Sequence, residues 1–247
     1  MHLIIQRNVY KVHVRTSAQS GTEKVVLALI AVQPLINVSL IVNMNKELYI
    51  TIYYESLCPD SKDFVLNQLR PAVRYLHEYI VLRLIPFGKS KSVNGGADGF
   101  VCQHGPKECL GNRVQNCALS QMADRSDADK VAYVACEMTH KSGAHGSYAC
   151  ASKANISVHD VEKCVNSEEG TRLQKHSELI TKLARPSFIP TVIVDGMFMQ
   201  EIQDSSLIDF IATLCSMLNE IKFCAHYYNK IAMHHLLYSP LNLYTYE

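Results

Sequence analysis

The chain has 247 residues, with 24 basic and 23 acidic side chains, so its formal net charge at neutral pH is +1. This length is sufficient for one domain with a full hydrophobic core. The balanced charge gives no electrostatic basis for binding nucleic acid or an anionic membrane surface, and no nucleic-acid partner is expected.

The N-terminal region contains a strongly apolar stretch, residues 25–42, which follows several basic residues. This pattern resembles a secretory signal sequence, and a signal anchor is the alternative. We therefore expect residues 1–45 to be a signal-like or anchor segment, with membrane contact only if it stays uncleaved. Two sequons, at Asn37 and Asn155, fit N-glycosylation in the secretory pathway.

The first predicted elements are a strand, a helix and a second strand. Residues 47–54 are rich in β-branched and aromatic side chains, which favours a strand. Between Val65 and Ile80, apolar residues recur every three or four positions, which predicts one face of a helix. Pro71 should kink this helix or begin its second half. Residues 80–87 indicate a buried strand, parallel to the first and reached by a right-handed crossover.

The middle of the chain is predicted to be mostly helical. Residues 88–105 are rich in glycine and are expected to form a loop. The apolar pattern then predicts helical segments over residues 108–123, 128–138 and 157–184. Pro186 lies just beyond the last of these and ends the helical block.

The C-terminal part predicts two strands and a last helix. Residues 188–196 indicate a strand that ends in Asp195-Gly196, a two-residue hairpin signal, and residues 197–202 indicate the returning strand. The sequence Asp204-Ser205-Ser206 can cap the helix that follows. The predicted buried stripe of that helix consists of Leu207, Ile211, Leu214 and Leu218. Residues 225–247 would then be a tail or a propeptide.

This order of elements predicts the α/β class, with a thioredoxin-like sheet and a large helical insertion over about residues 88–187. The predicted domain spans residues 46–224. Because the insertion carries most of the cysteines, we expect it to be held together by disulfides.

Nine cysteines are the outlier of the composition, and eight of them follow residue 100. Dense cysteine suggests an oxidising compartment, in which eight cysteines can form four disulfides. Cys58 would then be the single free thiol, unless a cysteine such as Cys215, on an apolar helix face, is unpaired instead. The eight are Cys102, Cys109, Cys117, Cys136, Cys150, Cys164, Cys215 and Cys224. Nothing in the sequence selects their pairing.

Residues 102–117 carry a dense motif of cysteine and polar residues. Its eight fixed positions are Cys102, Gln103, His104, Gly105, Glu108, Cys109, Asn112 and Cys117. With this motif the chain resembles the gamma-interferon-inducible lysosomal thiol reductase family over about residues 46–224. The resemblance implies a thiol–disulfide oxidoreductase that acts on disulfides of protein substrates in endosomes or lysosomes, or after secretion.

The family's active site is Cys-x-x-Cys, and the resemblance implies that Cys58 is the attacking thiol here. Disulfide exchange requires a thiolate, which the unpaired N–H groups and dipole of a helix N-terminus stabilise. Cys58 lies between a predicted strand and a predicted helix, with Pro59 placed to begin that helix. The alternative is that Cys58 is bridged to another cysteine.

Pro190 is the second element that the resemblance implies, as a cis-proline that faces the thiol and the substrate. It precedes the expected strand in Phe188-Ile189-Pro190-Thr191. A trans-proline that opens a strand is the alternative.

Ser61 stands where the family has its second cysteine. A serine hydroxyl can donate a hydrogen bond to the Cys58 thiolate, but it cannot resolve a mixed disulfide. Three outcomes remain open: an external small thiol resolves the intermediate, the protein acts as an isomerase or trap, or the scaffold serves a non-catalytic secreted binding protein. No other cofactor is expected.

The 102–117 motif has a competing interpretation as a zinc site, because it combines three cysteines with a histidine. The cysteine spacing favours a disulfide clamp, so no metal is expected. His104 can tune the active site or contact substrate, or it can hold its loop by hydrogen bonds. Gln103, Glu108 and Asn112 are expected to fix the loop rather than to act as catalysts.

Overall fold

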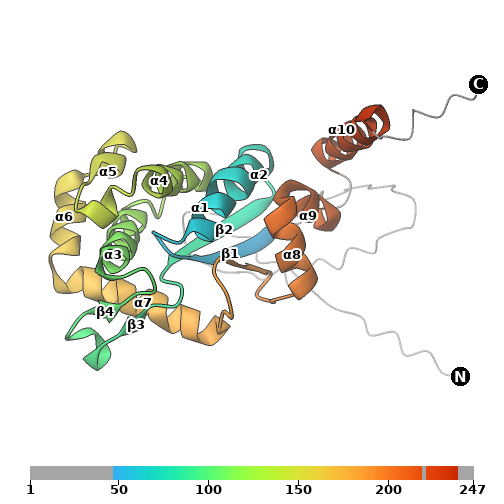
Figure 1. Ribbon diagram of the computed structural model, residues 1–247. Coiled ribbons are helices and arrows are strands. Elements are labelled where there is room, and N and C mark those ends of the chain that lie inside the picture. The colour runs from blue at the N-terminus through green and yellow to red at the C-terminus, as the bar shows by residue number, and fades with distance from the viewer. Residues whose placement is uncertain (1–46, 219–220, 239–247) are drawn as a thin grey trace, which may run out of the picture. The chain divides into compact units, whose positions relative to one another are not determined.

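The computed structural model describes residues 47–218 and 221–238 (Figure 1). The predicted signal-like segment and the Asn37 sequon lie outside the described residues. Within those residues, no helix has both the length and the apolar character needed to cross a membrane.

A three-stranded sheet forms the centre of the domain. The middle strand is β1 (Leu48–Tyr54), which lies between β2 (Ile80–Pro86) and β5 (Thr191–Val194). β1 runs parallel to β2, as predicted, and antiparallel to β5. Together with the helices that follow, this mixed sheet confirms the predicted α/β, thioredoxin-like class.

The register and pleat of β1 decide which of two apolar clusters each of its side chains enters. Ile50 pairs with Leu82 of β2 and with Val194 of β5. Successive side chains of a strand point to opposite faces. Ile50 therefore enters the main core, whereas Tyr53 joins a smaller apolar cluster that also contains Cys58.

A continuous helical run connects β1 to β2. It consists of α1 (Pro59–Asp63), a π-helical segment (Phe64–Leu69) and α2 (Arg70–Leu76), and the residues at both junctions have right-handed helical backbone angles. Pro71 lies in the first turn of α2, so it begins the second half of the run, which was one of the two predicted outcomes. The run buries an apolar face in the main core.

The insertion between β2 and β5 is mostly helical, as predicted. Its helices are α3 (Pro106–Gln121), α4 (Asp127–His140), α5 (Ala149–Lys153), α6 (Val158–Val165) and α7 (Glu168–Ala184). These helices pack on one another beside the sheet (Figure 1). The single helical range predicted over 157–184 is divided, because α6 ends at Val165 and Ser167 precedes α7.

Residues 88–105, predicted as a loop, also contain a small sheet. β3 (Lys91–Ser92) pairs antiparallel with β4 (Phe100–Val101). One 3-10 turn (Asn94–Gly96) lies between these strands, and another (Gly143–His145) lies between α4 and α5. Strands of two residues are too short for periodicity in the sequence to reveal them.

The strand predicted over residues 197–202 is wrong. Asp195 and Gly196 do turn the chain, with φ angles of 49° and 75°, but only Met197 bridges back to β5. The chain then enters α8 (Gln200–Ile208). The three residues after the turn have exposed side chains, so a returning strand would have no buried face to stabilise it.

The last predicted helix is present but begins later and is capped differently. Asp204 lies inside α8, and Asp209 caps α9 (Phe210–Met217) by accepting the N–H of Ala212 at 2.9 Å. Three residues of the predicted buried stripe, Ile211, Leu214 and Leu218, are buried. The fourth, Leu207, lies in α8 instead and is 42% exposed.

Much of the predicted tail is helical. α10 (Lys222–Tyr238) follows α9, and the disulfide between Cys215 and Cys224 joins the two helices. Whether this segment is a propeptide stays a prediction.

Candidate active site around Cys58

Cys58 lies at the start of the helical run that follows β1. Its backbone is extended, with φ −64° and ψ 123°, and Pro59 occupies the first turn of α1. The backbone N–H of Ser61 donates a hydrogen bond to Cys58 Sγ at 3.4 Å. Among the described residues Cys58 is the free cysteine, and it is buried, with 6% of its surface exposed. The sulfur of Cys58 therefore caps the start of the helical run and accepts a backbone N–H there.

The segment around Pro190 lies against this thiol. The Ile189–Pro190 peptide bond is cis, and Cys58 Sγ lies 3.8 Å from the Ile189 carbonyl oxygen. A pocket of about 330 Å³ beside Pro190 is lined by residues of α1 and by Phe188 and Leu207. The fold therefore brings Cys58 and the Pro190 segment, which are 132 positions apart in the sequence, to one place.

Ser61 contacts the thiol through its backbone rather than its side chain. The expected hydroxyl hydrogen bond to Cys58 is absent from the described contacts of Ser61. Its Oγ instead accepts the backbone N–H of Glu55 at 3.3 Å, and the residue is fully buried. The hydroxyl thus fixes the turn between β1 and α1, and the sulfur receives the Ser61 backbone N–H.

The other eight cysteines form four disulfides. The pairs are Cys102–Cys109, Cys117–Cys164, Cys136–Cys150 and Cys215–Cys224. Their Cα–Cα distances lie between 5.3 and 5.9 Å, in the ordinary range for disulfides. This pairing excludes Cys215 as a free thiol. It also removes the sulfur ligands from the zinc interpretation of the 102–117 motif, because a disulfide sulfur is not a thiolate.

Two residues of the 102–117 motif hold the turn before Cys58. The side-chain oxygen of Asn112 accepts the N–H of Ser56 at 2.8 Å, and Ser56 Oγ donates to the Glu108 carbonyl at 3.0 Å. Asn112 also donates to Ser90 Oγ at 3.4 Å. The first turns of α3 thus clamp the chain two residues before the thiol.

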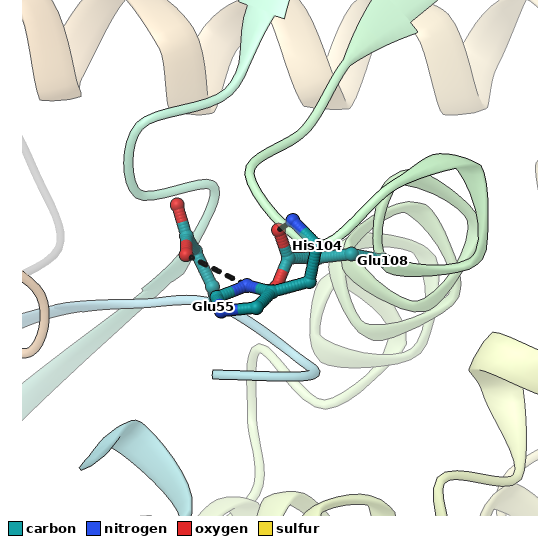
Figure 2. Close-up of side chains that lie close together, drawn as sticks. All are labelled: Glu55, His104 and Glu108. Atoms are coloured by element: carbon teal, nitrogen blue, oxygen red, sulfur yellow. Dashed lines mark hydrogen bonds and ion pairs between the residues drawn. The ribbon is translucent and has the colours of Figure 1, made fainter. Parts of the chain in front are cut away.

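His104 joins this turn to the disulfide loop. Its backbone N–H donates to Glu108 Oε1 at 3.0 Å, and its Nδ1 lies 2.6 Å from Glu108 Oε2. The same Nδ1 lies 3.5 Å from Oε2 of Glu55, at the end of β1 (Figure 2). Both carboxylates are fully buried, whereas the His104 side chain is 31% exposed.

Glu55 is a site residue that reasoning from the sequence missed. It lies three positions before Cys58, and its carbonyl accepts the Cys58 N–H at 3.3 Å. Burial raises the pKa of the Glu55 carboxyl to about 7; the Lys89 N–H opposes this rise and the nearby Glu108 charge adds to it. The sequence feature that could have indicated Glu55 is its position as an acidic residue directly after a predicted strand.

Two glycines are required by the geometry of this region. Gly105 precedes α3 with a φ of 84°, in the left-handed region that favours glycine. Gly88 has a φ of 56°, and a Cβ placed on it would lie 2.2 Å from Glu55 Cγ. The Glu55 side chain therefore occupies space that only glycine leaves free.

Two further predicted site residues, Gln103 and Asn155, are exposed. Gln103 is exposed and makes no described side-chain hydrogen bond. Asn155 is exposed in the turn between α5 and α6, where a glycan would have room. Its glycosylation stays a prediction.

Comparison with known proteins places these features in a family. Residues 49–167 match the family model described as "Gamma interferon inducible lysosomal thiol reductase (GILT)". The chain is 36% identical to a gamma-interferon-inducible lysosomal thiol reductase-like protein of Anopheles gambiae, over 68% of this chain and 76% of the relative. It is 33% identical to GILT-like protein 1 of Drosophila melanogaster, over 67% of this chain and 73% of that one.

A solved structure is also similar. The DsbA of Chlamydia trachomatis matches 72% of this chain and 91% of its own, with 15% identity and a TM-score of 0.49. The two insect relatives are matched over most of their length, and this chain carries all eight positions of the 102–117 motif. The chain belongs to the gamma interferon inducible lysosomal thiol reductase family.

Proposed function

We propose that this protein reduces disulfide bonds of protein substrates, with Cys58 as the attacking thiol. The observation that carries this proposal is the position of Cys58: a free cysteine at a helix N-terminus, hydrogen-bonded by the Ser61 N–H and next to the Ile189 carbonyl. The other eight cysteines are held in disulfides. Cys58 is therefore the thiol that can react.

The first step forms a mixed disulfide. The Cys58 thiolate attacks one sulfur of the substrate disulfide, that S–S bond breaks, and the other substrate sulfur leaves as a thiolate that takes a proton from solvent. The Ser61 backbone N–H stabilises negative charge on Cys58 Sγ before the attack. The same N–H stabilises the Cys58 thiolate when that sulfur becomes the leaving group in the last exchange.

The second step requires an external small thiol, because Ser61 has no sulfur. One small thiol attacks Cys58 Sγ, which releases the reduced substrate and leaves Cys58 bonded to the small thiol. A second small thiol then restores Cys58 and departs as a small-molecule disulfide. In balance, one substrate disulfide is reduced and two small thiols are oxidised.

An unfolded polypeptide is the substrate class that fits the surface near the thiol. The pocket beside Pro190 is lined by apolar side chains as well as by Asp60 and Asp63. The nearby chain exposes large apolar residues, including Met197 at 62% and Ile208 at 79%. Exposed apolar surface of this kind serves for contact with another chain.

We propose that the protein works in the secretory pathway, in an acidic endosomal or lysosomal compartment or after secretion. Four disulfides are typical of proteins that fold in an oxidising compartment. Relatives of this chain are named as lysosomal thiol reductases. The predicted signal-like segment and the Asn155 sequon support the same route.

The test is reduction of a disulfide-linked peptide by protein secreted with its disulfides intact, in excess small thiol and from acidic to neutral pH. Replacing Cys58 with Ala should abolish the rate above that of the small thiol alone. Cys58→Ser is the matched control for folding, because serine also caps helices, and it should be equally inactive. A wild-type rate in Cys58→Ala would show that Cys58 is not the nucleophile.

The second candidate function is that of a non-catalytic secreted binding protein. The buried Ser61 favours it, because no second thiol is available in the first turn of α1. In that case the wild type and Cys58→Ala would retain the same partner equally well, and neither would accelerate disulfide reduction. A mixed disulfide trapped on Cys58 with substrate would exclude this candidate.

A further inference from the structure

Three ionisable side chains from two parts of the chain converge near the turn that carries Cys58. Glu55 follows β1, His104 lies inside the loop closed by Cys102–Cys109, and Glu108 lies in the first turn of α3 (Figure 2). One ligand atom from each lies within 4.8 Å of the other two. The atoms that meet are His104 Nδ1 and one carboxylate oxygen of each glutamate.

One of these atoms lacks a hydrogen-bond partner. Glu55 Oε1 accepts the Lys89 N–H at 2.6 Å, but Glu55 Oε2 is buried and accepts no hydrogen bond. This oxygen points toward His104, whose Nδ1 is 3.5 Å away and is already paired closely with Glu108 (Figure 2). A buried polar atom without a partner is costly, and a bound cation would satisfy it.

We propose that Glu55, His104 and Glu108 form a binding site for one divalent transition-metal ion, for which Zn²⁺ is the best fit. Carboxylate oxygens and imidazole nitrogen are both zinc ligands, and a site with three protein ligands leaves a fourth position open. The imidazole favours transition metals over Ca²⁺ and Mg²⁺, which prefer oxygen ligands alone. The partly exposed His104 leaves a route from solvent.

The surrounding contacts orient these ligands, as a metal site requires. Glu108 uses its second oxygen, Oε1, for the His104 backbone N–H, and Glu55 uses its second oxygen for Lys89. Each carboxylate therefore keeps Oε2 directed toward the cluster. Outer contacts of this type fix ligand orientation and support affinity.

The bound ion would link two parts of the fold that meet beside the turn before Cys58. It would tie the end of β1 to the Cys102–Cys109 loop, which includes the first turn of α3. Because the Glu55 carbonyl accepts the Cys58 N–H, this link reaches the turn that carries the thiol. The role proposed for the ion is to hold that turn, and it takes no part in disulfide exchange.

The test measures metal binding directly in a Cys58→Ser background, so that the free thiol cannot bind the ion. Titration calorimetry with Zn²⁺, and absorption spectra with Co²⁺ as a probe, should show one site per chain without the sulfur-to-metal bands of thiolate ligation. Glu55→Gln and His104→Ala should each weaken Zn²⁺ binding by at least about tenfold. Ca²⁺ should bind far more weakly than Zn²⁺.

The matched control is Glu137→Gln, which neutralises another buried glutamate outside the cluster and should bind Zn²⁺ as the parent does. The proposal is overturned if the parent binds no Zn²⁺, or if Glu55→Gln and His104→Ala bind it as tightly as the control. Equal affinity for Ca²⁺ would overturn the transition-metal assignment. None of these measurements uses reductase activity, so failure of the metal-site proposal can be distinguished from failure of the proposed function.

Discussion

The backbone N–H of Ser61 lies 3.4 Å from the sulfur of Cys58, whereas the hydroxyl of Ser61 is bonded to the N–H of Glu55. Ser61 therefore does two separate things. Its main chain supports the thiol, and its side chain closes the turn from β1. Substitutions at Ser61 can separate these two contributions.

Replacing Ser61 with Cys should increase turnover of a disulfide substrate. Positions 58 and 61 lie three residues apart at the start of one helical run, so they share a face, and a sulfur at 61 can attack the mixed disulfide internally. We expect an increase of roughly tenfold or more, with weaker dependence on the external thiol, since intramolecular attack has a high effective concentration. Steady-state rates at varied small-thiol concentration measure this. An unchanged rate would argue against the proposed mixed-disulfide step.

Replacing Ser61 with Ala should lower stability but leave the thiol reactive. The change leaves the buried N–H of Glu55 without its acceptor, which costs about 1–3 kcal/mol of unfolding free energy. The backbone donor to Cys58 remains. Denaturant unfolding should show the loss, and the alkylation rate of Cys58 should stay within about twofold of wild type because its donor is unchanged. A large fall in alkylation rate would show that the hydroxyl acts on the sulfur.

Replacing Gly88 with Ala should destabilise the site beyond the cost of backbone strain. The added Cβ would lie 2.2 Å from Glu55 Cγ, and the Glu55 side chain, which is fully buried, would have to shift. Gly99 is the matched control, because its φ of 81° is also positive but a Cβ there meets nothing within 4 Å. We expect losses of about 1 kcal/mol for Gly99→Ala and about 2–4 kcal/mol for Gly88→Ala in thermal or denaturant unfolding. Equal losses would mean that the Glu55 side chain is not confined.

Glu137 should make the folded protein more stable in acid than at neutral pH. Burial raises the pKa of this carboxyl, although hydrogen bonds from the Gly143 N–H and the Ser142 hydroxyl oppose the rise. The folded state then binds the proton more strongly than the unfolded chain does. The contribution is complete below the ordinary carboxyl pKa and declines as pH rises through the raised folded value.

Glu137→Gln tests this linkage, because glutamine stays neutral at every pH. Unfolding free energies measured across the acidic to neutral range should fall less steeply with pH in this variant than in wild type. A slope identical to that of wild type would contradict the raised pKa of Glu137.

The sequence by itself determined the features that depend on local pattern or residue identity. Apolar periodicity predicted the helical run after Cys58, because helical contacts join residues three or four positions apart. The count of cysteines predicted four bridges and one free thiol. The 102–117 motif identified the family, since it requires only the order of residue types along the chain.

Only the tertiary structure decided the contacts between residues far apart in the sequence. The pairing of Cys117 with Cys164 depends on how α3 and α6 pack. The hydrogen bond from Ser56 to Asn112 and the meeting of Glu55 with His104 depend on how the end of β1 lies against the start of α3. The returning strand after β5 failed for the same reason, because a strand is stabilised by its partner and by a buried face. No local pattern carries that information, so Glu55 became a site residue only when the fold placed it beside His104.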